Sequence, residues 1–347
     1  MKPVLFVTNH VPPERVGAFA ALARRVPLEL AIFGGRSTHA SAGVADPGVA
    51  HRHVRQREIL RLAASGRYGA VVCGTAGRLA LPAAALGACA ARVPFVLWSA
   101  LWAHPRTPAH VVGGAPLLAT LYRTADAVVA YGPHVAAFAR ARGATNVHVA
   151  PQAVDNAFWG ASVAVERSAP FTAVFLGRPS WAKGAVLLLD AWHLSGLGAA
   201  AAALVLVGAG PGLARSPSGG AVAVIGAQPP EQVRNFLAGA DVCVIPSLRT
   251  RSFREPWGLV ANEAMNQSTP VIASDEVGAA AGGLVRHERN GLVVTAGDRA
   301  ALAGALRRLH DDADLRARLG ANARRDVAPY TFDAWAAGFA AALRSIR

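Results

Sequence analysis

The sequence predicts an α/β protein with two doubly wound domains, each a parallel sheet between helices. Its 347 residues exceed one ordinary core, and its 53 % hydrophobic and 16 % charged residues let two domains bury cores of their own. Short apolar runs alternate with Ala-, Leu- and Arg-rich segments of helical period, which is typical of βα units. This alternation lapses between residues 151 and 170 and then restarts. We therefore expect the two domains to join there.

The expected elements follow in chain order from these runs. In a first domain, residues 1–154, strands are predicted at 4–8, 28–33, 70–73, 94–98, 127–130 and 147–150. In a second domain, residues 155–330, strands are predicted at 172–176, 203–207, 222–225, 241–245, 270–273 and 291–294. Helices are expected at 299–310 and 312–327. A C-terminal helix within 331–347 is expected to pack back on the first domain.

The positive charge is shared unevenly between the two halves. Residues 1–154 carry 16 Lys and Arg against 5 Asp and Glu, a net charge of +11, whereas residues 155–347 carry 19 against 16, a net charge of +3. Such an excess suits an anionic membrane, a phosphorylated acceptor or nucleic acid, although solvated helix faces explain any single cluster. The densest segment, 51–61, places Arg57 and Arg61 one helical turn apart, so it could dock on a surface.

Neither long apolar tract, 93–103 or 197–210, has the length of a membrane-spanning helix. The N-terminal sequence MKPVLFVTNH reads as a buried strand and not as a signal peptide. We expect a cytoplasmic protein, with peripheral attachment to a membrane as the alternative that the charge leaves open.

The segment that leaves strand 172–176 contains candidate phosphate-binding residues. Gly177 lets a diphosphate approach the backbone, and Arg178 and Lys183 can neutralise the charge of a leaving group. The chain has only one other lysine, Lys2, which favours a specific role for Lys183 over that of an ordinary surface lysine. Gly208 begins a second glycine turn, 207–212, which is a weak signal by itself.

Two glutamates flank a predicted helix start in the segment REPWGLVANEAMN. With a helix beginning near Trp257, Glu255 and Glu263 are predicted about 12 Å apart, the distance from a transferred sugar to a nucleotide ribose. The N–H groups of Gly258 and Leu259 would then face the diphosphate, although acids near a helix start are also common as caps. The residues expected to contact substrate here are Pro256, Trp257, Gly258, Leu259 and Val260.

These motifs, in this order and spacing, resemble the donor domain of glycosyltransferase family 4. The resemblance rests on GRPSWAKG, the glycine turn, ADVCVIPS, the two glutamates eight residues apart, NEAMNQSTPVIAS and HERNGLVVTAGD. It covers residues 120–347, and the first 120 residues only as architecture. It implies a GT-B fold, in which two Rossmann-like domains face a central cleft. It also implies a retaining, metal-independent transferase with a nucleotide diphosphate sugar as co-substrate and no cofactor.

Within this family pattern, Arg178 and Lys183 contact the diphosphate, Glu255 the sugar hydroxyls and Glu263 the ribose. The first 120 residues depart from the pattern, because NHVPPERVGAF replaces the paired-glycine loop that usually follows the first strand. The family's histidine after the fourth strand is matched only by His104, which lies further from the strand; a structural or acceptor-binding role is the alternative. His10, at the end of the first strand, is a second candidate.

Other functions compete with this hypothesis. A nucleotide-sugar epimerase and a non-catalytic nucleotide-sugar-binding partner both fit a GT-B shape, whereas a dehydrogenase is disfavoured because no G-x-G-x-x-G follows either first strand. Asp312 and Asp314 form a D-x-D pattern, but helix capping accounts for them, so no metal ligand is predicted. The acceptor is expected to be a small molecule, a glycan or a lipid-linked sugar, and nucleic acid is not expected as a partner.

Overall fold

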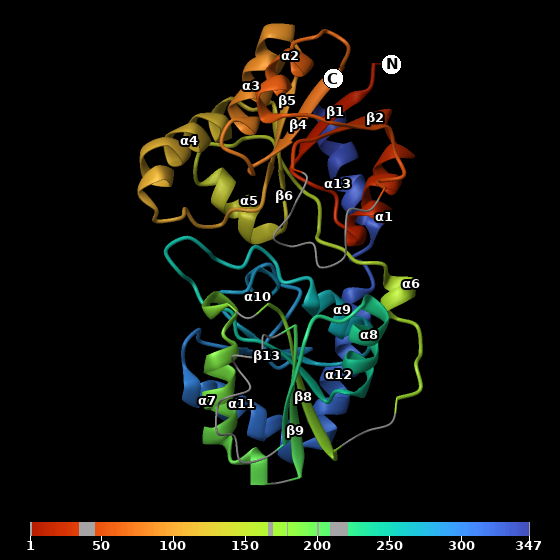
Figure 1. Ribbon diagram of the computed structural model, residues 1–347, viewed down its shortest axis with the longest axis vertical. Helices are drawn as coiled ribbons and strands as arrows, with labels where there is room; N and C mark the ends of the chain where they lie inside the picture. Colours follow the sequence, from red (N-terminus) through yellow and green to blue (C-terminus); the bar gives the residue numbers. More distant parts are fainter. Residues whose placement is uncertain are drawn as a thin grey trace. The chain divides into compact units, whose positions relative to one another are not determined.

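The computed structural model describes residues 2–34, 46–165, 169–178, 180–199, 201–208 and 221–346. The chain forms two compact units (Figure 1). Unit 1 contains Met1–Asp155 and Tyr330–Arg347, and unit 2 contains Asn156–Pro329. Each unit is built on one parallel sheet, which confirms the predicted α/β class with two Rossmann-like domains.

The sheet of unit 1 has the strand order β3-β2-β1-β4-β5-β6-β7. Its strands are β1 (Val4–Thr8), β2 (Leu28–Ile32), β3 (His51–His53), β4 (Ala70–Gly74), β5 (Phe95–Ser99), β6 (Ala127–Ala130) and β7 (Val147–Val149). All neighbours are parallel, with Val4 of β1 opposite both Leu28 and Ala70. The central strands are almost entirely apolar because helices cover both faces of such a sheet. The edge strand β3 was not predicted.

Helices cover both faces of this sheet. One face packs against α1 (Pro13–Ala23) and α13 (Phe332–Ser345). The other face packs against α2 (Ile59–Ala63), α3 (Ala80–Ala91) and α4 (Ala115–Thr124), together with Ala139 of α5 (Pro133–Arg140). The short helices η1 (Gln56–Glu58) and η2 (His110–Gly114) precede α2 and α4.

The C-terminal helix α13 belongs to unit 1, as predicted. Its Phe339 ring lies 5.3 Å from the ring of Phe6 on β1, 5.7 Å from that of Trp98 on β5 and 4.4 Å from that of Trp335. Phe6, Trp335 and Phe339 are completely buried. The last helix of the chain therefore completes the core over the first strands.

The sheet of unit 2 has the strand order β10-β9-β8-β11-β12-β13, again all parallel. Its strands are β8 (Phe171–Leu176), β9 (Ala202–Val207), β10 (Ala221–Ile225), β11 (Val242–Ile245), β12 (Val271–Ser274) and β13 (Gly291–Val294). Its helices are α6 (Asn156–Trp159), α7 (Ala185–Ser195), α8 (Pro230–Gly239), α9 (Val260–Asn266), α10 (Gly278–Ala281), α11 (Arg299–Asp311) and α12 (Ala313–Val327), with η3 (Trp181–Lys183) and η4 (Leu197–Ala199).

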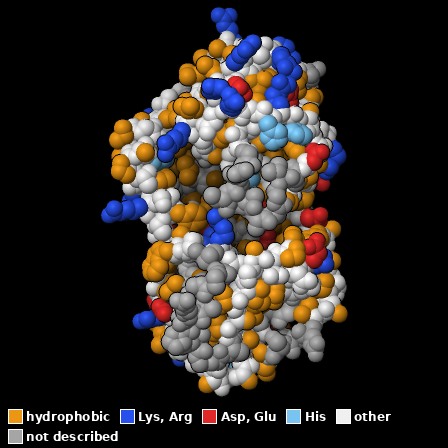
Figure 2. All heavy atoms as spheres, viewed as in Figure 1, with side chains coloured by type: hydrophobic (Ala, Val, Ile, Leu, Met, Phe, Trp, Pro, Cys, Tyr) orange, Lys and Arg blue, Asp and Glu red, His pale blue; other side chains and the backbone are white. Residues whose placement is uncertain are grey.

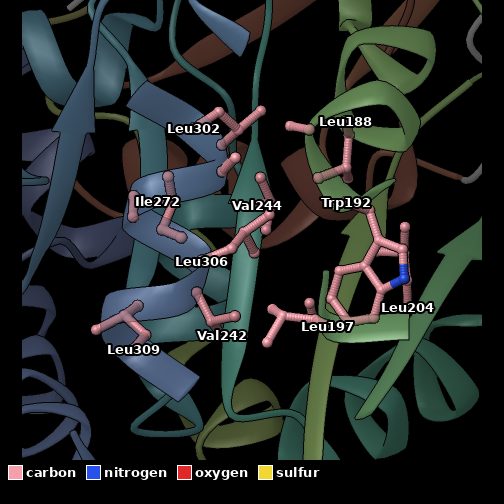
Figure 3. Packing of buried hydrophobic residues seen from close by; sticks show 14 of the residues in the cluster. Leu188, Trp192, Leu197, Leu204, Val242, Val244, Ile272, Leu302, Leu306 and Leu309 are labelled. Atoms are coloured by element: carbon pink, nitrogen blue, oxygen red, sulfur yellow. The ribbon is translucent and has the colours of Figure 1, made fainter. Parts of the chain in front are cut away.

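The core of unit 2 lies between its sheet and the helices α7 and α11. Figure 3 shows Leu188 and Trp192 of α7 and Leu306 of α11 beside Val244 of β11. Trp192 and Leu306 are completely buried. This packing fixes β8 and β11, and the candidate site residues follow the carboxyl ends of these two strands.

The D-x-D pattern lies at the start of α12. The Oδ1 atom of Asp312 accepts a hydrogen bond of 2.8 Å from the N–H of Leu315, so Asp312 caps this helix. In the described ranges, no helix is long and apolar enough to cross a bilayer.

Candidate active site

The candidate site of unit 2 lies where the strand order reverses. In the order β10-β9-β8-β11-β12-β13, the chain runs outward from β8 in one direction and from β11 in the other. Ligands of open parallel sheets bind beyond the carboxyl ends of the strands at such a switch point. The segment after β8 carries Arg178 and Lys183, and the segment after β11 carries Ser247 and Glu255.

Close backbone packing joins these two segments. Gly184, directly after Lys183, has a φ of +74°, and a Cβ atom at this position would overlap the carbonyl oxygen of Pro246. In addition, the N–H of Leu248 donates a hydrogen bond of 2.8 Å to the carbonyl oxygen of Ala182. Only glycine combines this backbone angle with this approach. The packing therefore brings Lys183 to the end of β11.

Lys183 and Glu255 form an ion pair at this junction. The Nζ atom of Lys183 contacts Oε2 of Glu255, and the hydroxyl of Ser247 donates a hydrogen bond of 3.1 Å to the same oxygen. Glu255 is only 6 % exposed and Ser247 only 1 %. A buried carboxylate is costly unless it is paired and hydrogen-bonded, and here it is both. The arrangement holds a cation and an anion side by side at the switch point.

Residues that follow a third strand, β12, hold the backbone of Glu255 in place. Glu255 forms a parallel bridge with Val277, and its carbonyl oxygen accepts a hydrogen bond of 3.1 Å from the N–H of Gly278. Ser274, at the end of β12, donates a hydrogen bond of 2.6 Å to the carbonyl oxygen of Ser247. The carboxylate of Glu255 is thus positioned by rigid backbone. Ser247 was not singled out from the sequence, although a serine at the carboxyl end of a strand was the available signal.

The predicted start of the following helix is wrong. Helix α9 begins at Val260 and not near Trp257, because Gly258 has a φ of +88° and lies outside the helical region. The N–H groups of Gly258 and Leu259 consequently precede the helix instead of forming its first turn. Helix α9 spans 7 residues.

Trp257 is an internal residue of this loop. Its indole is buried, with 2 % exposed, and its Nε1 donates a hydrogen bond of 2.7 Å to Oδ1 of Asn262. Its carbonyl oxygen accepts a hydrogen bond of 2.7 Å from the N–H of Ala279. The buried ring of Trp257 therefore stabilises the segment from Pro256 to Val260. Contact between this segment and substrate stays a prediction.

Glu263 lies in the first turn of α9 and is half-buried. Its N–H donates a hydrogen bond of 3.1 Å to the carbonyl oxygen of Leu259. Two helical turns do not connect Glu255 and Glu263, because residues 255–259 are not helical. The separation expected for their carboxylates stays a prediction. Burial raises the pKa of Cys243 on β11, and the carboxylate of Glu263 adds to this shift, which places Glu263 near that strand.

Gly177 and Gly208, two of the three glycines predicted to contact substrate, lie against each other. Gly208 has a φ of +79°, and a Cβ atom there would lie 2.9 Å from the carbonyl oxygen of Gly177. The N–H of Gly177 donates a hydrogen bond of 3.0 Å to the carbonyl oxygen of Val207. Arg178 follows as an exposed residue. The remainder of the predicted glycine turn, residues 209–212, lies outside the described residues.

The two candidate histidines belong to unit 1. Nδ1 of His104 lies 3.0 Å from Nε2 of His110, and Nε of Arg142 donates a hydrogen bond of 3.1 Å to Nε2 of His104. Burial, followed by the charges of Arg142 and His110, lowers the pKa of His104. These contacts engage both ring nitrogens and favour the structural alternative. His10 is half-buried just after β1, and its carbonyl oxygen accepts a hydrogen bond of 3.2 Å from Thr8.

Comparison with known sequences matches the region that carries this site. Residues 163–326 match the family described as Glycosyl transferases group 1. The D-inositol 3-phosphate glycosyltransferase of Streptomyces coelicolor is 38 % identical over 124 residues, which are 34 % of this chain and 25 % of that protein. The lipopolysaccharide core biosynthesis glycosyltransferase LpsD of Rhizobium meliloti is 41 % identical over 86 residues, 25 % of this chain and 23 % of that protein. The similarity thus spans at most about a quarter of these relatives.

Solved structures resemble nearly the whole chain. The crystal structure of Anabaena Alr3699/HepE in complex with UDP and glucose has a TM-score of 0.75 and 19 % identity, over 99 % of this chain and 100 % of that one. Sucrose-phosphate synthase from Thermosynechococcus elongatus has a TM-score of 0.73 and 19 % identity, over 99 % and 98 %. These similarities show the fold, two Rossmann-like domains of the GT-B type.

Proposed function

We propose that this protein is a glycosyltransferase that moves a sugar from a nucleotide diphosphate sugar to an acceptor, with retention of anomeric configuration and without a metal ion. The observation that carries this proposal is the ion pair between Lys183 and the buried Glu255 at the switch point of unit 2. The family match over residues 163–326 supports it, because that region includes both residues. The crystal structures of Anabaena Alr3699/HepE in complex with UDP and glucose and with UDP-glucose, which share this fold, support the class of donor.

In the proposed reaction, the bond between the anomeric carbon and the leaving phosphate oxygen breaks first. Its electron pair passes to the diphosphate, whose charge Lys183 and Arg178 neutralise. The acceptor oxygen then bonds to the oxocarbenium-like carbon from the same face, and the departing phosphate takes the acceptor's proton. Gly177, Gly208 and the segment 256–260 let the donor approach the backbone.

The two glutamates have separate proposed roles. Glu255 accepts hydrogen bonds from the sugar hydroxyls, and Glu263 accepts them from the ribose. Because Lys183 already contacts Glu255, the ammonium group is held in place before donor binds, which lowers the cost of ordering it. The proposed acceptor is a small molecule, a glycan or a lipid-linked sugar, and the proposed location is the cytoplasm, with peripheral membrane contact.

The test is release of nucleoside diphosphate from a panel of nucleotide sugars with candidate acceptors. The donor is identified first, as the compound that raises the melting temperature. Lys183→Ala is expected to lower transfer about 100-fold, the usual loss for one preorganised charge contact. Lys2→Ala is the matched control, because Lys2 is the other lysine and its Nζ atom donates a hydrogen bond of 2.6 Å to the exposed carbonyl oxygen of Gly66, outside the unit that carries the candidate site. Near-normal turnover of a folded Lys183→Ala variant would contradict the proposal.

A further inference from the structure

Unit 1 carries exposed leucines and arginines on the helices α2 and α3 and in the residues that directly precede each helix. We define the α2–α3 surface by the exposed residues Arg57, Leu60, Arg61, Arg78, Leu79 and Leu86. The three leucines are 45 %, 59 % and 63 % exposed, in sequence order. Figure 2 shows hydrophobic side chains interspersed with Lys and Arg side chains over this part of unit 1.

Packing makes these residues one continuous surface. A Cβ atom on Gly87 of α3 would lie 2.8 Å from the carbonyl oxygen of Leu60 on α2, so the two helix backbones are in contact. Leu86 precedes this glycine. Oε1 of Gln56 accepts hydrogen bonds of 2.9 Å from the N–H of Leu79 and 3.2 Å from the N–H of Ala80, which ties η1 to the start of α3.

The surface is positively charged without compensation nearby in the sequence. No aspartate or glutamate occurs between Ile59 and Ala125. The same stretch contains Arg61, Arg67, Arg78, Arg92, Arg106 and Arg123. Glu58 is the nearest acid, and its Oε2 accepts a hydrogen bond of 2.8 Å from the N–H of Arg55. Within the described ranges, Arg57, Arg61 and Arg78 form no ion pair.

We infer that the α2–α3 surface docks on an anionic lipid bilayer. Guanidinium groups pair with lipid phosphates and are attracted by the negative surface potential. Leucines next to them can leave water by entering the interface between headgroups and acyl chains. A duplex nucleic acid would satisfy the arginines but leave the leucines against a polar backbone. The defined surface also has no aromatic side chain on which single-stranded bases could stack.

The test uses vesicle flotation of the full chain without any nucleotide sugar, so that its outcome is independent of the proposed transfer reaction. We expect binding to vesicles that contain phosphatidylglycerol and not to pure phosphatidylcholine, with binding weakened by salt. The triple variant Leu60→Ser, Leu79→Ser, Leu86→Ser is expected to lower the partition coefficient about 100-fold. Leu194→Ser is the matched control, because Leu194 is 50 % exposed on unit 2.

Charge-reversal variants separate the electrostatic contribution to vesicle binding from the contribution of the leucines. Arg57→Glu with Arg61→Glu is expected to weaken binding to anionic vesicles at least about tenfold. Arg307→Glu, at an exposed position of α11, should leave binding unchanged. Because the replaced side chains are exposed, the variants should melt at the temperature of the unmodified protein. Equal binding to neutral vesicles, or binding to a duplex oligonucleotide but not to vesicles, would overturn the inference.

The chain contains a natural reporter for this docking. Of its three cysteines, Cys73 and Cys243 are buried, whereas Cys89 is exposed on α3, three residues after Leu86. A polarity-sensitive fluorophore on Cys89 should shift to the blue with anionic vesicles, and this shift should be lost in the triple leucine variant. A label whose emission stays unchanged as anionic vesicles are added would overturn the inference.

Discussion

Pairing of Lys183 with Glu255 should contribute measurably to the stability of unit 2, and a double-mutant cycle can isolate this contribution. Lys183→Met and Glu255→Gln remove the charges but keep the approximate shape of each side chain. The glutamine can still accept the hydrogen bond from Ser247. The cycle therefore reports the interaction between the two charges.

The magnitude follows from the exposure of the two side chains. The side chain of Lys183 is 24 % exposed and that of Glu255 only 7 %. At an effective dielectric constant near 20, two charges in contact attract by about 4 kcal/mol. Desolvation of the carboxylate offsets part of this attraction, so we expect a coupling free energy of about 2 kcal/mol. An exposed pair contributes about 0–1 kcal/mol.

The assay is urea unfolding with hydrogen exchange followed in peptides from β8 and β11, which reports unit 2 separately from unit 1. The matched control is the exposed pair of Arg299 and Asp190, whose side chains are 59 % and 52 % exposed at a distance of 3.9 Å. Arg299→Met with Asp190→Asn should give a coupling near zero. A coupling for Lys183 and Glu255 no larger than that of the control would refute the reasoning.

Two further predictions concern the backbone and the histidines. Gly184→Ala should destabilise unit 2 by at least about 2 kcal/mol, because the added Cβ atom would overlap the carbonyl group of Pro246. The control Gly196→Ala has a similar φ of +73° but open space around it, so it should destabilise unit 2 by only about 1 kcal/mol. Urea unfolding measures both values. Burial lowers the pKa values of His104 and His110 in the folded protein. As the pH falls, the unfolded chain therefore binds protons at these histidines before the folded protein does. The free energy of unfolding of unit 1 should consequently fall as the pH drops below about 6.5. The double variant His104→Gln, His110→Gln should flatten this dependence of stability on pH, whereas the control His51→Gln, at an exposed position, should not. The same pH dependence in the double variant and in the unmodified protein would contradict the assignment of this effect to His104 and His110.

The fold class was predictable because hydrophobic periodicity reports burial directly. Runs such as 4–8 and 291–294 coincide with strands β1 and β13, since both faces of a parallel sheet must be apolar. Strand β3 was missed for the same reason. Its sequence is His51-Arg52-His53, it lies at the edge of the sheet, and it is largely exposed, so it has no apolar pattern.

The candidate site was only partly predictable. Position after a strand and residue type were enough to single out Lys183 and Glu255, but their contact depends on the fit of Gly184 against Pro246, which are far apart in the sequence. The start of α9 was misplaced because Gly258 adopts a left-handed angle that neighbouring residues do not specify. The roles assigned to the site residues are still predictions.

Insertion of unit 2 into unit 1 has a consequence for biosynthesis. The chain leaves unit 1 after Asp155 and returns to it at Tyr330. The ribosome therefore synthesises all of unit 2 before it makes Trp335 and Phe339, which fill the aromatic core beside Phe6. Until then the nascent first sheet exposes an apolar face, the kind of surface that chaperones recognise. Unit 2 is continuous in the chain, whereas unit 1 cannot complete its core until a segment that follows unit 2 has been synthesised.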